Sequence, residues 1–178
     1  MQKKSLLKLF FELLGYVLAG NLLSLVVTIS LSGFLTETNE NIIFGISSVC
    51  SILLLITCVF SVGYKDGELE RKLINRKTLE KPDPNKWFII GGIVWILMCI
   101  LCAMLNIIPG TMYLQVFRFA VASMFALSLF FGSSEIPAFA PFIFMGVFAL
   151  IPVACRVGYY AGFYDKIAID NIIYKKKK

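Results

Sequence analysis

Cys99 and Cys102 form a C-x-x-C motif, a spacing that suggests chemistry on its own. Such a pair exchanges thiols and disulfides when one thiol is an accessible thiolate. Here the motif lies in the middle of an apolar run, where burial opposes thiolate formation. The expected outer loops carry no second cysteine pair. The redox interpretation is therefore weak, and all five cysteines are interpreted as small buried apolar residues.

Three polar residues inside apolar runs are the candidates for a functional role: Arg118, Asn21 and Asn106. A charge within a membrane span is costly, which makes it a hypothesis for function. Arg118 is the strongest of the three because it is alone in its stretch. The alternative is that Arg118 has only a structural role, in which its side chain reaches the outer headgroups or pairs with Glu135. The two asparagines are expected to hydrogen-bond across helices.

Other constellations that carry chemistry are absent from the sequence. It contains no histidine, the commonest general base and metal ligand. We find no glycine loop for phosphate, metal cluster, intramembrane aspartate pair or Ser/Lys dyad. The sequence therefore predicts no catalytic, cofactor-binding or metal site, and a protein that is not an enzyme.

Composition indicates that lipid is the solvent for most of the surface. The 178 residues are 58% hydrophobic and 16% charged, whereas soluble domains are about 45–50% apolar and about 25% charged. The charges gather in the N-terminal octet, in residues 65–86 and in residues 165–178. The net charge of +6 is interpreted as topogenic, with no role in binding nucleic acid.

Charge also sets the predicted topology. Residues 65–86 carry seven Lys/Arg, and the N-terminal octet and the final Lys175–Lys178 are basic, whereas residues 32–41 carry only acids. The bias in Lys/Arg places basic segments in the cytoplasm, so both termini are cytoplasmic and the number of spans is even. The predicted spans are 9–31, 42–64, 87–108 and 136–160. Residues 112–131 are expected to form an outer-side helix, interfacial or partly inserted. Five spans with the tail outside is the alternative.

A repeat divides the chain into two related helical hairpins, 1–81 and 82–178, within one membrane domain, 1–178. Residues 62–67 and 157–162 both read V-G-Y-x-x-G. Each holds a G-x-x-x-G pair, which lets helix backbones approach closely in lipid. The pairs are Gly63 with Gly67 and Gly158 with Gly162. We expect them to pack helices within the monomer; a homodimer face and a ligand contact are the alternatives.

The V-G-Y-x-x-G exits, Ile108-Pro109-Gly110 and the ending Ile173-Tyr174-Lys175–Lys178 together resemble an uncharacterised group of small multi-pass membrane proteins of Firmicutes. The resemblance covers these short pieces and the layout. It implies a bacterial cytoplasmic membrane and four spans, but it implies no activity.

The fold class expected is thus an all-α polytopic membrane bundle. Residues 68–80 mix charges of both signs and are expected to continue the second helix into the cytoplasm.

The sequence favours a non-enzymatic accessory or scaffold subunit that contacts the lipid bilayer and another membrane or cytosolic subunit. A small-solute transporter, or the substrate-binding subunit of one, is the alternative, and a membrane enzyme is the least favoured class.

Overall fold

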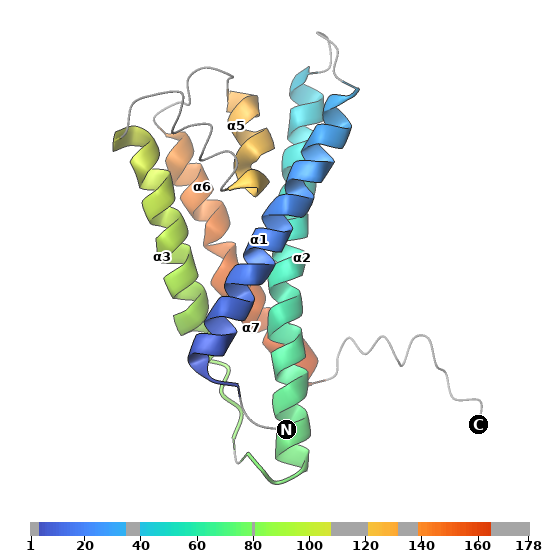
Figure 1. The fold of residues 1–178 in the computed structure, drawn as a ribbon, viewed down its shortest axis with the longest axis vertical. Coiled ribbons are helices and arrows are strands. Elements are labelled where there is room, and N and C mark those ends of the chain that lie inside the picture. Colours follow the sequence, from blue (N-terminus) through green and yellow to red (C-terminus); the bar gives the residue numbers. More distant parts are fainter. Residues whose placement is uncertain (1–3, 35–39, 80, 108–120, 132–138, 165–178) are drawn as a thin grey trace, which may run out of the picture.

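The computed structural model describes residues 4–34, 40–79, 81–107, 121–131 and 139–164. Over these residues the chain is helical and contains no strand (Figure 1). The long helices are α1 (Leu6–Ser32), α2 (Glu40–Asn75), α3 (Lys86–Ile107), and α6 (Ala140–Phe148) continued by α7 (Leu150–Phe163). A 3₁₀ turn, η1 (Ala122–Met124), precedes the short helix α5 (Phe125–Phe131).

Among the residues that the structure describes, four helical segments are long and apolar enough to cross a membrane: α1, α2, α3 and the combined α6–α7. Large apolar side chains are exposed along each of them, as lipid contact requires. The chain is therefore a multi-pass membrane protein, and the predicted all-α class with four spans is confirmed. Helix α1 begins and α7 ends at the same end of the bundle (Figure 1). We call this the lysine-rich end; it is the end predicted to be cytoplasmic.

The fourth span is not one continuous helix. Residues 136–138 lie outside the described residues, and the helix is interrupted at Ala149, between α6 and α7. Pro152 has no N–H to donate to the carbonyl of Phe148, one turn earlier, so the regular bonding pattern fails there. Pro152 also packs against α3, where a Cβ added to Gly91 would lie 2.7 Å from the proline Cα.

The segment expected to form a helix over 112–131 differs from that expectation in its described part. The α-helix begins only at Phe125, after a turn and the 3₁₀ residues of η1. The N–H of Ser123 donates instead to the side chain of Asn21 in α1, at 3.0 Å. With seven residues, α5 is about 10 Å long and cannot cross the hydrocarbon core. It packs against α2, while residues 112–120 lie outside the described residues.

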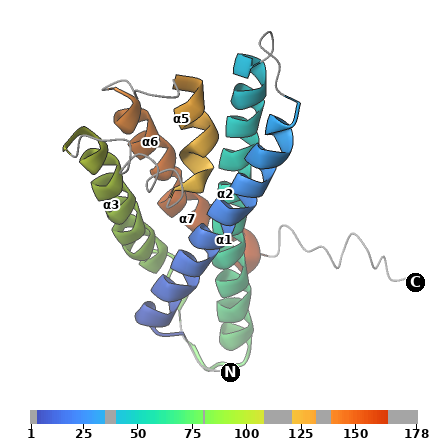
Figure 2. The same ribbon diagram turned by 45° about the horizontal axis from the view of Figure 1, so that its top comes forward.

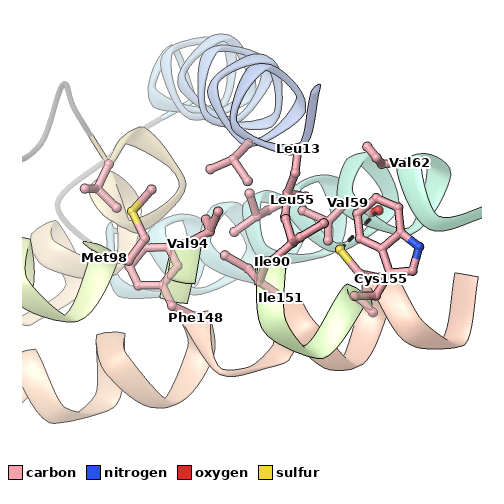
Figure 3. Packing of buried hydrophobic residues seen from close by; sticks show 14 of the residues in the cluster. Leu13, Leu55, Val59, Val62, Ile90, Val94, Met98, Phe148, Ile151 and Cys155 are labelled. Carbon is pink, nitrogen blue, oxygen red and sulfur yellow. Dashed lines mark hydrogen bonds between the residues drawn. The ribbon is translucent and has the colours of Figure 1, made fainter. Parts of the chain in front are cut away.

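The apolar core lies where α1, α2, α3 and α7 meet (Figure 3). Leu13 of α1, Leu55 of α2 and Ile90 of α3 converge there with Ile151 of α7. The thiol of Cys155 faces the carbonyl oxygen of Val59 across the α2–α7 contact, at 3.9 Å.

Helices α2 and α7 run side by side in the same direction and make the closest contact in the bundle (Figures 1 and 2). All four glycines of the repeated motif lie in this contact. A Cβ at Gly63 would lie 2.0 Å from a backbone carbonyl oxygen of α7, and one at Gly158 would lie 2.3 Å from a carbonyl oxygen of α2. Gly67 and Gly162 are equally crowded. Each repeat thus packs reciprocally against the other within one chain.

This crowding predicts a strong effect of a single methyl group. Gly67→Ala places Cβ 2.2 Å from the carbonyl oxygen of Tyr159, so the helices must separate. We expect the free energy of unfolding to fall by ~1–3 kcal/mol, as in overpacked cores. Gly45→Ala is the matched control, because it lies in the same helix with nothing within 4 Å of the added Cβ. Thermal unfolding in detergent measures both variants, and an equal midpoint for the two would contradict the close contact.

Candidate functional site: a buried charge cluster

Five polar or aromatic side chains meet inside the lysine-rich end of the bundle. Asp66 and Glu70 come from α2, Lys86 and Trp87 from α3, and Tyr159 from α7. None is more than 3% exposed. Lysines and carboxylates are almost never fully buried unless they are paired. We call this group the charge cluster and take it as the candidate functional site.

Local sequence explains how these residues reach one another. Asp66 and Glu70 are one helical turn apart, so they point the same way from α2. They lie on the stripe that also carries Gly63 and Gly67, and this stripe faces α7.

The end of α2 then turns the chain back toward the bundle. Lys77 adopts φ 57°, and its N–H and that of Thr78 donate to the carbonyls of Ile74 and Leu73 at 2.8 and 3.0 Å. These two bonds form a Schellman motif, which ends the helix. The short connection that follows leads directly to Lys86 in the first turn of α3.

Lys86 is the centre of the cluster. Its Nζ lies 2.5 Å from Asp66 Oδ2 and 2.7 Å from Glu70 Oε1. It also lies 5.4 Å from the centre of the Tyr159 ring. A cation at a helix N-terminus is unfavourable because of the helix dipole. The two carboxylates offset this cost and that of removing the ammonium group from water.

The remaining polar atoms of the cluster are almost all satisfied. Glu70 Oε2 accepts hydrogen bonds from the Tyr159 hydroxyl and from the backbone N–H of Asp83, the latter at 3.2 Å. Trp87 Nε1 donates to Asp66 Oδ2 at 3.1 Å. Asp66 Oδ1 is buried without a partner. The cluster therefore ties α2, α3, α7 and the connection at Asp83 together through side chains that solvent does not reach.

The cluster contains none of the three polar residues singled out from the sequence. Asn21 is buried in α1, where its side chain accepts a hydrogen bond from the backbone of Ser123, a residue that is not part of the charge cluster. Asn106 lies in α3, but its side chain is not among those described. Arg118 lies outside the described residues.

Sequence reasoning missed the charge cluster because it treated residues 65–86 as a source of topogenic charge. Asp66 and Glu70 were visible as acids, and their spacing from Gly63 and Gly67 (i, i+3, i+4, i+7) marks one helix face. A carboxylate on the face of a glycine packing motif is a signal for burial. The position of Lys86 beside Trp87, at the start of an apolar run, was the second available signal.

The thiols of Cys99 and Cys102 are free, and Cys102 is buried in α3. Within the described ranges no group of three or more His, Cys, Asp or Glu is arranged to hold a metal ion.

No protein-family model, curated protein or solved structure matches the chain. Function is therefore inferred from geometry alone.

The paired charges predict a sharp contrast between two lysines. Lys86→Met leaves two buried carboxylates without their cation, which costs ~3–5 kcal/mol in buried pairs. Lys72→Met is the control, because Lys72 pairs with Glu68 on the exposed face of α2, where such pairs contribute ~0–1 kcal/mol. We expect a large fall in the unfolding midpoint for the first variant and little change for the second.

A triple variant separates charge from packing. Adding Asp66→Asn and Glu70→Gln to Lys86→Met removes the uncompensated charge while keeping side-chain volume. A buried neutral amide costs much less than a buried carboxylate without its cation. The triple variant should therefore regain most of the stability lost by Lys86→Met, and failure to regain any would show that Lys86 acts by packing.

Proposed function

We propose that the chain is a non-enzymatic accessory or scaffold subunit of a membrane assembly, and that the projecting end of α2 binds its partner. The observation that carries this proposal is the length of α2. Its 36 residues extend about 54 Å, whereas the hydrocarbon core is about 30 Å thick. The excess lies at the lysine-rich end, where residues 65–75 continue the helix beyond the uncharged span 42–64.

The charge cluster supports a rigid projection. Glu70 lies in this extension and is held by Lys86 and by Tyr159, which belong to two other helices. An isolated helical extension of this length frays in water, because short helices are marginal without tertiary contacts. Bracing by α3 and α7 gives the extension a fixed direction relative to the membrane domain, as a docking element requires.

The surface of the projecting end is basic as a consequence of this fold. The cluster takes the acids Asp66 and Glu70 into the interior. The basic side chains exposed between residues 65 and 81 are Lys65, Lys72, Arg76, Lys77 and Lys81. We define the α2 tip as residues 71–77, which comprise the end of α2 and the two residues that follow it. Charge complementarity favours a membrane or cytosolic partner that presents an acidic surface to it.

The alternative, a small-solute transporter or its substrate-binding subunit, is favoured by one separate observation. The buried polar atoms Asn21 Nδ2, Ser51 Oγ and Ser123 Oγ lack hydrogen-bond partners, as the lining of a polar solute site would. The location in a bacterial cytoplasmic membrane with both termini cytoplasmic is part of the proposal, supported by the basic residues at one end of the bundle.

Neutralising the α2 tip tests the proposal. The tagged full-length chain and its Arg76→Gln/Lys77→Gln variant are purified from their own membranes in mild detergent, and proteins recovered with them are quantified by mass spectrometry. We expect a stoichiometric partner with wild type. Two surface charge contacts of ~0.5–1 kcal/mol each correspond to at least about a fivefold lower recovery with the variant.

Lys8→Gln/Lys81→Gln is the matched control, because both lysines are exposed and lie outside residues 71–77. It should recover the partner as wild type does. A chain that purifies alone, as a monomer or homodimer, contradicts the accessory role. Equal loss of the partner in both variants would agree with the accessory role but would show that the α2 tip is not the specific binding surface.

A further inference from the structure

A second group of buried polar side chains lies away from the charge cluster, around Asn21 of α1. Asn21 Nδ2, Ser51 Oγ and Ser123 Oγ are buried and have no hydrogen-bond partner. Asn21 is 3% exposed, and the two serines are fully buried. Buried polar atoms are almost always hydrogen-bonded, so each of these three needs an explanation.

The three residues belong to three elements that pack against one another: α1, α2 and η1. Asn21 Oδ1 accepts the backbone N–H of Ser123 at 3.0 Å, which joins α1 to η1. Ser24, one turn after Gly20 in α1, places its Oγ 2.8 Å from the Gly20 carbonyl oxygen and 3.2 Å from that of Ser51. These contacts bring α2 and η1 to the same stretch of α1.

Neighbouring serines show what a satisfied hydroxyl looks like in this bundle. Ser48 donates to the carbonyl of Phe44 at 2.7 Å, within its own helix. Ser47 donates to Thr28 Oγ1 at 2.9 Å, across the α1–α2 contact. Ser51 lies in the same row of α2 and has neither kind of partner for its hydroxyl. Of these three serines only Ser51 has an unpartnered hydroxyl, and its carbonyl accepts from Ser24, about one turn from Asn21 along α1.

Location determines the kind of molecule that would pair with them. Asn21 is near the middle of α1, where bulk water does not reach. The buried charged residues among those described are Asp66, Glu70 and Lys86, all in the charge cluster. With no charge to balance an ion here, the complementary molecule is uncharged. It must accept from Asn21 Nδ2 and exchange hydrogen bonds with two hydroxyls.

We propose that Asn21, Ser51 and Ser123 form a binding site for a small uncharged molecule that both donates and accepts hydrogen bonds. This goes beyond the proposed scaffold function and does not depend on it. The same chemistry has two sources, a trapped water and a small polar solute entering from the bilayer or the aqueous phase. Water is the smallest molecule that meets the requirement, and buried waters typically make about three hydrogen bonds.

The sign of a stability change tests the site. If a bound molecule pairs with the hydroxyls, Ser51→Ala and Ser123→Ala each remove a hydrogen bond and lower the unfolding midpoint by about 2–4 °C. If the hydroxyls are unpaired, the same substitutions remove an unsatisfied group and the midpoint stays or rises. Ser48→Ala is the reference variant, because this buried α2 serine donates a hydrogen bond within its own helix. Its unfolding midpoint shows how large a fall the loss of one known hydrogen bond causes. The double variant Ser51→Ala/Ser123→Ala should be less than additive, because both residues bind one molecule.

Acetamide distinguishes the two sources, since it is small, uncharged, and carries both a donor and an acceptor. A rise in the wild-type midpoint with added acetamide that is absent in Ser51→Ala identifies an exchangeable solute site. No rise, together with the destabilising and coupled serine variants, identifies an ordered water in the same site. Serine variants that are neutral, stabilising or strictly additive overturn the proposal.

Discussion

The close contact between α2 and α7 is the constraint on which the rest of the structure depends. In lipid, no hydrophobic force drives helices together, so association rests on close packing and polar contacts. Here backbone carbonyls of each helix occupy the space that a side chain on the facing glycine would need. Such a contact has one register only. Because Asp66 and Tyr159 are next to contact glycines in sequence, this register also decides which residues the charge cluster brings together.

The bundle separates its buried polar groups by charge. The ionic group lies at the lysine-rich end, where helix ends and their connection supply a backbone N–H as well as a lysine. The group around Asn21 lies further along α1 and contains only amides and hydroxyls. The cost of burying a charge is highest toward the bilayer centre, whereas neutral polar groups are tolerated there when they bond across helices. This distribution follows from the bilayer as solvent.

Much of the fold was predictable, and the reasons for the failures are local. Long apolar runs together with the bias in Lys/Arg identified the four spans, and mixed charge after residue 64 identified the extension of α2. The position of the interruption at Ala149 was not predicted, because a proline in a span indicates that the helix is disturbed but does not tell which turn is interrupted. The charge cluster was missed because periodicity tells which face of α2 is buried but not which residue of another helix meets it. That Lys86 points inward depends on tertiary contacts alone.

The two proposed roles use different halves of α2 and of the bundle. Toward the lysine-rich end, α2 is fixed to α7 by backbone contacts and to α3 by buried charges, so this part is suited to present a rigid docking surface. Toward the opposite end, α2 is joined to α1 by hydroxyl contacts such as Ser47 to Thr28. Hydrogen bonds of this kind contribute only ~0.6–2 kcal/mol in membranes. The contact between α2 and α7 leaves no room for sliding, because each glycine faces a backbone carbonyl of the other helix, so the α1 side of α2 is the less tightly fixed of the two.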